Sequence, residues 1–143
     1  MNPSLLDTAV TIARALGHSA RLRTIAMLRS GELCVCQIRA VLGLAPSTVS
    51  AHLRELRRAG LTAERKEGRW VWVGLGEDPT IRPWIDNALG GTSGDQQMLS
   101  DLKLVEEIKS LPVEDLCRLG YEAAREKRRL NVDAHRSKDG NAP

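Results

Sequence analysis

The stretch "PSTVSAHLRELRRAGLTAERKEGRWVWVGL", residues 46 to 75, decides the expected fold of this 143-residue chain. Its first half has a proline suited to the first turn of a helix, an apolar stripe at helical spacing, and a stop signal at Gly60. Its second half has two runs, "LTAERK" and "RWVWVGL", on either side of Glu67 and Gly68, which is the pattern of a two-stranded hairpin. The stretch therefore predicts a polar, basic helix followed by a basic hairpin.

The sequence on either side of this stretch is mostly helical in pattern. Apolar residues at helical spacing predict helices over residues 5 to 16, 19 to 28, about 35 to 42, 80 to 89, 96 to 110 and 112 to 130. The fold class that we expect is mainly α with a small β-hairpin, arranged as a winged helix-turn-helix with a C-terminal helical extension. The first helix and the helix around Trp84 carry apolar stripes that the core of a single copy would not fully bury, which favours a homodimer.

Composition shifts divide the chain into four expected parts. They are a winged helix-turn-helix DNA-binding and sensor domain (1–90), a flexible joint (91–94), a helical extension (95–131) and a disordered tail (132–143). No run of residues is long and apolar enough for a secretory signal or a membrane span, so we expect a cytoplasmic protein with no membrane partner.

The charge distribution points to a polyanionic partner. Residues 1 to 76 carry 11 basic and 5 acidic side chains, a net charge of +6, whereas residues 77 to 143 carry 10 and 13, a net charge of −3. In a winged helix-turn-helix, one helix enters the major groove of double-stranded DNA and the hairpin's cations lie against phosphates. The residues that we expect to bind DNA are Ser47, Thr48, Ser50, His52, Arg54, Arg57, Arg58, Arg65, Lys66 and Arg69.

Two of the three cysteines lie one residue apart in "GELCVCQI", residues 31 to 38. In a reducing compartment such thiols more often bind metal or sense redox state than form disulfide bonds that stabilise a fold. Cys34 and Cys36 lie near the start of a predicted helix, where the thiolate form is favoured.

Three motifs together resemble the ArsR family of metalloid-responsive repressors. They are "ELCVCQI", "STVSAHLRELRRAGL" and "RKEGRWVWVGL", and the similarity covers roughly residues 5 to 90. The resemblance implies a dimeric winged-helix repressor that binds a two-fold operator and leaves it when arsenite or antimonite binds thiolates. It is consistent with the chemistry of As(III) and Sb(III), which are soft centres that prefer pyramidal coordination by thiolates.

The spacing of the cysteine pair suggests a mechanism for release. In a regular helix, residues i and i+2 point about 200° apart, so two such sulfurs cannot easily face one ion. We therefore expect metalloid binding at Cys34 and Cys36 to distort the first turn of that helix and lower DNA affinity.

The cysteine pair does not itself supply a third ligand, because Arg39 stands where well-known members of the family carry another cysteine. Cys117 is the remaining candidate, but it lies on a predicted apolar stripe, where a cysteine is more often a small buried hydrophobe. A site with only two thiols would also suit methylarsenite, whose carbon substituent occupies one bond.

Two other functions are kept as alternatives. Cys34 and Cys36 could form a redox switch in the same DNA-binding fold, which would require an oxidant where arsenite would not. A Cys-x-Cys thiol oxidoreductase is more remote, because the chain lacks the alternating helices and parallel strands on which such enzymes are usually built. The three histidines are scattered and do not indicate a metal site.

Overall fold

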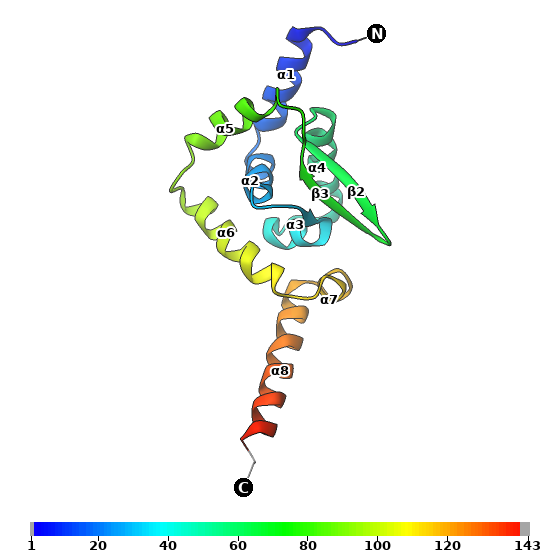
Figure 1. Ribbon diagram of the computed structural model, residues 1–143, viewed down its shortest axis with the longest axis vertical. Coiled ribbons are helices and arrows are strands. Elements are labelled where there is room, and N and C mark those ends of the chain that lie inside the picture. Colours follow the sequence, from blue (N-terminus) through cyan, green and yellow to red (C-terminus); the bar gives the residue numbers. More distant parts are fainter. Residues whose placement is uncertain (1, 141–143) are drawn as a thin grey trace.

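The computed structural model describes residues 2–140 and is mostly helical, with one small antiparallel sheet (Figure 1). The elements in chain order are α1 (Leu5–Leu16), α2 (Ser19–Leu28), β1 (Leu33–Cys34), α3 (Val35–Leu42), α4 (Pro46–Arg58), β2 (Thr62–Glu67), β3 (Trp70–Leu75), α5 (Arg82–Gly90), α6 (Gln96–Lys109), α7 (Val113–Leu119) and α8 (Tyr121–Asp139). None of the described helices is long and apolar enough to span a membrane.

Local sequence signals set the bounds of the helices that carry the DNA-binding motif. The side chain of Ser4 caps α1 by accepting from the backbone N–H of Asp7 at 3.0 Å. Gly43 ends α3 in the left-handed conformation, with φ 65°, and Pro46 begins α4 at its first turn. A short turn thus connects α3 to α4, as a helix-turn-helix requires.

The sheet has three strands in the order β1-β3-β2, so the expectation of a two-stranded hairpin was incomplete. The additional strand, β1, pairs Leu33 with Val73 and Cys34 with Trp72. A strand of two residues is too short to produce an alternating pattern, which is why the sequence did not reveal it. The first cysteine of the pair therefore belongs to the sheet and not to the helix.

The hydrophobic core lies between α2, α3, α4 and β3, and α6 covers it from the side of α2 and α3 (Figure 1). Val105 and Ile108 on α6 are each 1% exposed. A bidentate ion pair also holds α6 to α2, because Arg23 donates to both carboxylate oxygens of Asp101, at 2.8 and 2.9 Å. The segment beyond residue 90 thus folds back onto α2 and onto α3, the helix that carries Cys36.

The last predicted helix is divided. Gly120 separates α7 from α8. Its φ of 84° is a positive value that glycine adopts without steric cost and that does not continue a helix. The expectation of disorder from residue 132 is wrong for residues 132–139, which continue α8, and residues 141–143 lie outside the described part of the chain. Good helix formers such as Ala134, Arg136 and Lys138 account for this continuation.

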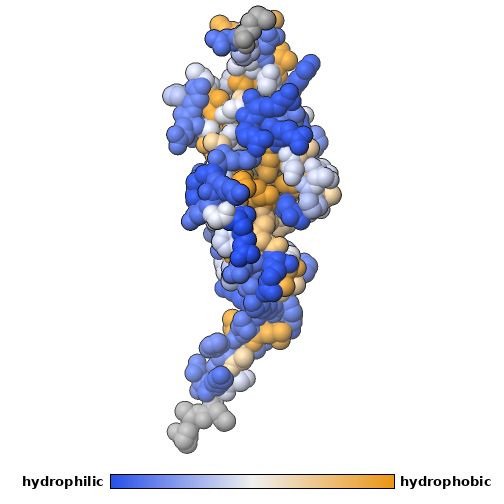
Figure 2. All heavy atoms as spheres, turned by 90° about the vertical axis from the view of Figure 1, so that its right-hand side faces the viewer, coloured by the Kyte–Doolittle hydropathy of each residue, from blue (hydrophilic) through white to orange (hydrophobic). Residues whose placement is uncertain are grey.

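Apolar side chains remain exposed at the end of the molecule where α1 begins. Leu5 and Leu6 on α1 are 91% and 73% exposed at this end, and elsewhere Trp84 on α5 is 37% exposed. Figure 2 shows this end at the top, where orange residues lie on the surface, while most of the face that carries β2 and β3 is hydrophilic.

Candidate thiol centre and nucleic-acid interface

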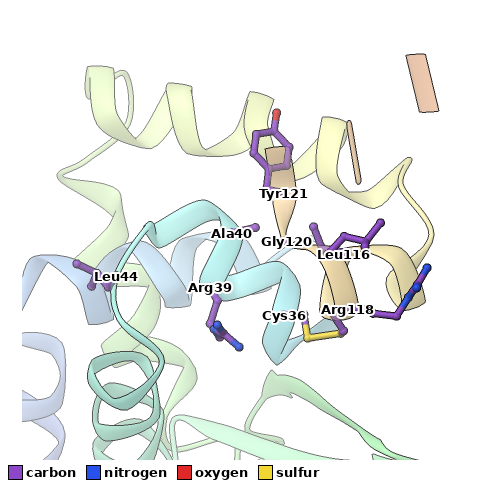
Figure 3. Close-up of a pocket in the computed structure, with 10 residues that line it drawn as sticks. Cys36, Arg39, Ala40, Leu44, Leu116, Arg118, Gly120 and Tyr121 are labelled. Atoms are coloured by element: carbon purple, nitrogen blue, oxygen red, sulfur yellow. A yellow bond between two sulfur atoms is a disulfide. The ribbon is translucent and has the colours of Figure 1, made fainter. Parts of the chain in front are cut away.

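The structure brings all three cysteines together. Cys34 lies at the end of β1, Cys36 in the first turn of α3 and Cys117 in α7, and their sulfur atoms lie within 4.8 Å of one another. Cys36 and Cys117 form a disulfide with a Cα–Cα distance of 5.3 Å, which Figure 3 shows as a yellow bond between α3 and α7. Sulfurs that share one ion through bonds of about 2.3 Å lie less than about 4.6 Å apart. The three cysteines therefore fit a soft ion once the Cys36–Cys117 disulfide is reduced, its two sulfurs separate and Cys34 approaches them.

The prediction that Cys34 and Cys36 point to opposite sides is wrong. Cys34 is the N-cap of α3 with extended backbone angles, φ −70° and ψ 149°, so the angular spacing of a helix does not apply to the pair. The side chain of Gln37 holds this geometry, since it accepts from the backbone N–H of Cys34 at 2.8 Å. Coordination therefore does not require the first turn of α3 to unwind.

Cys117 is not the buried hydrophobe that its apolar stripe suggested. Its side chain is only half-buried and its sulfur is bonded to Cys36, while Leu116 beside it fills the core at 3% exposure. The contact of α7 with α3 brings it there, over a sequence separation of 81 residues. No local pattern could report that proximity.

Two open cavities flank the thiols. One, of about 380 Å³, lies on the side of α4 and the sheet, and its lining includes Cys34, Arg54 and Arg69. The other, of about 360 Å³, lies on the side of α7, and its lining includes Cys36 and Cys117. The thiol centre thus borders both solvent and the expected DNA-binding surface.

The expected DNA-binding residues lie on α4 and on the β2–β3 hairpin, which forms the wing. Nine of the ten are exposed, namely Ser47, Thr48, Ser50, Arg54, Arg57, Arg58, Arg65, Lys66 and Arg69. The tenth, His52, is buried, so its placement on the outward face is corrected.

The side chain of His52 instead lies on the inner side of α4, against His18 and Arg21. Its ring lies 4.4 Å from that of His18, centroid to centroid, and its Nδ1 lies 3.2 Å from the guanidinium of Arg21. Because a guanidinium only donates, Nδ1 must accept and therefore carries no proton. Burial, His18 and Arg21 together lower the pKa of His52 from its ordinary value of 6.5.

The wing's cations differ in how strongly the protein itself holds them. Arg65 forms ion pairs with Glu32 at 2.8 Å and with Glu67 at 2.7 Å, and its guanidinium lies 5.6 Å from the ring centre of Trp72. Hydrogen bonds to these two carboxylates raise the pKa of Arg65. Lys66 has no such ion pair within the described residues.

Comparisons with known proteins agree with this architecture. Residues 18–62 match the model of the bacterial regulatory protein, arsR family. The arsenic resistance transcriptional regulator ArsR1 of Pseudomonas putida is 36% identical over 103 residues, which cover 69% of this chain and 79% of that protein. The chain belongs to the ArsR family.

Two further comparisons extend the similarity. The arsenical resistance operon repressor of Escherichia coli is 36% identical over 76 residues, covering 52% of this chain and 63% of that protein. The homodimeric winged helix-turn-helix DNA-binding domain of Mb0332 from Mycobacterium bovis superimposes with a TM-score of 0.56 at 26% identity, covering 67% of this chain and 93% of that domain. As an ArsR-family member, the chain is a DNA-binding transcriptional regulator, which argues against the thiol oxidoreductase.

Proposed function

We propose that this protein is a homodimeric repressor of arsenic resistance genes that releases its operator when As(III) or Sb(III) binds Cys34, Cys36 and Cys117. The observation that carries this proposal is the convergence of three sulfurs within 4.8 Å. The names of the relatives in Pseudomonas putida and Escherichia coli support the connection with arsenic. A thiol set without histidine or carboxylate favours a soft, thiophilic ion.

The position of the thiols supports a direct effect on the wing. Cys34 pairs with Trp72 in the sheet, and Glu32, two residues earlier, holds Arg65 of the wing. When Cys34 moves to coordinate an ion, β1 shifts against β3 and carries the wing with it. Metalloid and operator then oppose each other, and the opposition is reciprocal.

The same shift reaches the recognition helix. The cavity on the DNA side is lined by Cys34 and Cys36 and also by Ser50, Arg54 and Arg57 of α4. A change at the thiols therefore alters the support of side chains that we expect to contact phosphates and bases. This route replaces the unwinding of α3 as the mechanism of release.

A redox response is the second candidate function, and the Cys36–Cys117 disulfide favours it, although the partner of Cys36 is Cys117 and not the expected Cys34. Oxidation joins α3 to α7 by a covalent bond, whereas metalloid binding joins β1, α3 and α7 through one ion. An organic arsenical such as methylarsenite would bind only two of the thiols. The metalloid response and the redox response are distinguished by what each one requires. Arsenite acts under full reductant, whereas a redox switch acts only with an oxidant.

Operator binding by fluorescence anisotropy tests the proposal. In reductant, arsenite should release the wild-type protein from DNA and should fail to release Cys34→Ser, which retains the Cys36 and Cys117 thiols. Oxidant without arsenite should leave the wild-type complex intact. Release of Cys34→Ser by arsenite at the wild-type concentration would show that the ion binds elsewhere.

A further inference from the structure

The cavity on the α7 side of the thiol centre has a cationic rim. It is an open hollow of about 360 Å³, and its lining includes Cys36 and Arg39 from α3 and Cys117, Arg118 and Tyr121 from the C-terminal extension. Figure 3 shows Arg39 and Arg118 on either side of the Cys36–Cys117 bond. We call this hollow the thiol vestibule.

The charge of the thiol vestibule is not neutralised locally. Both arginines are exposed, and no carboxylate belongs to the lining. Within the described residues Arg39 forms no ion pair, and Arg118 has only a long contact of 3.8 Å with Asp115. Once the disulfide is reduced, two guanidinium groups lie beside two thiols and provide a site for a ligand that carries both sulfur and negative charge.

We infer that the thiol vestibule receives the metalloid as a complex with small carboxylated thiols, whose carboxylates bind Arg39 and Arg118 while the metalloid passes to the protein's thiols. This inference rests on the proposed function and specifies the form in which the inducer arrives. Arsenite itself is uncharged at neutral pH, so two arginines would not attract it.

The transfer balances without any net redox change at the metalloid. An excess of the same small thiol first reduces the Cys36–Cys117 disulfide: two thiols become one small disulfide, and the two protein sulfurs take up their protons. Each exchange then forms one bond from a protein sulfur to arsenic and breaks one bond from arsenic to a small thiolate. The proton of the protein thiol passes to the departing thiolate.

Burial sets the order of these exchanges. Cys36 and Cys117 line the thiol vestibule and are half-buried, so they receive the ion first. Cys34 is 1% exposed and adds the third bond. No residue of α4 or of the wing belongs to the vestibule lining, so a complex can enter while α4 and the wing are on DNA. The step that moves β1 is therefore the last one.

Stopped-flow absorbance of sulfur-to-arsenic bonding tests the inference on the reduced, full-length protein. Arsenite would be mixed beforehand with 3-mercaptopropionate, 2-mercaptoethanol or cysteamine, thiols of similar size that carry negative, no and positive charge. We expect transfer to be fastest from the carboxylated complex and slowest from the cationic one, by about tenfold between the two, with the difference shrinking at high salt.

The variants separate this inference from the proposed function. In Arg39→Gln/Arg118→Gln, the advantage of the carboxylated complex over the cationic one should disappear, whereas Arg136→Gln, on the exposed end of α8, should retain it. An unchanged rate order in the double variant would overturn the vestibule's role while leaving the metalloid site intact. Failure of every complex to transfer arsenic to the wild-type protein would overturn the proposed function itself.

Discussion

At the scale of single residues, the Arg21–His52 contact connects the recognition helix to the helices beneath it. Arg21 on α2 donates to the carbonyls of Ala15 and Arg14 at the end of α1, at 2.7 and 3.0 Å, and also to His52 on α4. A cation at the C-terminal end of α1 interacts favourably with its free carbonyls. This one side chain thus joins three helices, provided that His52 is neutral.

Acid should therefore loosen this junction. Because the pKa of His52 is lowered in the fold, the unfolded chain binds its proton more readily than the folded protein does. The stability contributed by neutral His52 is complete above pH 6.5 and is lost as the pH falls through the lower pKa of the folded state. We expect the melting temperature to drop between pH 7 and pH 5.

The variant His52→Gln provides the control for this prediction. Glutamine can still accept from Arg21 but does not titrate, so its melting temperature should depend less on pH over the same range. His135→Gln, at an exposed position of α8, should behave like the wild type. Equal pH dependence in all three proteins would show that protonation of His52 does not cause the loss of stability in acid.

The sequence could identify most of the polar and basic face but not the position of His52. Exposed Ser47 and Arg54 and buried Leu53 follow the helical period as expected. His52 lies one residue before Leu53, at the edge of the apolar stripe, where the period does not decide between core and surface. Its burial depends on Arg21 and His18, which reach it from another helix.

At the scale of elements, β1 is the structural link between the thiols and the wing. The sequence predicted the hairpin from two runs on either side of the Glu67-Gly68 turn, and it predicted the cysteine pair as a candidate site. It could not predict that two residues before α3 would join the sheet, because that pairing is between residues about 40 apart in the chain, Cys34 and Trp72. For the same reason, the sequence could not predict that Cys117 lies beside Cys36.

The wing's cations should contribute unequally to DNA binding. Arg65 is held by Glu32 and Glu67, whereas Lys66 is free of such partners within the described residues. Each lost phosphate contact should reduce the salt slope of binding by about 0.9. We expect Lys66→Gln to show this loss and Arg65→Gln to show much less.

Anisotropy titrations of the two variants at several salt concentrations provide the measurement. If Arg65→Gln lowers the slope as much as Lys66→Gln does, Arg65 leaves its carboxylates when DNA binds. The role that we give to the Glu32–Arg65 ion pair in transmitting the motion of β1 would then be wrong.

At the scale of the whole molecule, the exposed leucines of α1 favour an interface between two copies. Leu5 and Leu6 stand clear of the core, and α5 adds the half-exposed Trp84. The homodimeric domain from Mycobacterium bovis supports the same expectation. A two-fold repressor places its two recognition helices on the half-sites of a palindromic operator.

Leu6→Asp should weaken that interface. A buried leucine contributes about 1.5–3 kcal/mol, and each copy supplies one, so we expect the dimer dissociation constant to rise at least about tenfold. Leu130→Asp, at a 55% exposed position of α8, is the matched control and should stay dimeric. Sedimentation equilibrium distinguishes the two outcomes, and a Leu6→Asp dimer as tight as the wild type would exclude α1 from the interface.

Arsenite-induced operator release by Cys117→Ser, measured in reductant, tests the three-cysteine sensor most directly. Operator affinity without arsenite should equal that of the wild type, because Cys117 lies outside α4 and the wing. With one of three sulfur ligands removed, release should require at least about tenfold more arsenite. Release at the wild-type arsenite concentration would contradict the account, since the third ligand that the fold brings to Cys34 and Cys36 would then have no part in sensing.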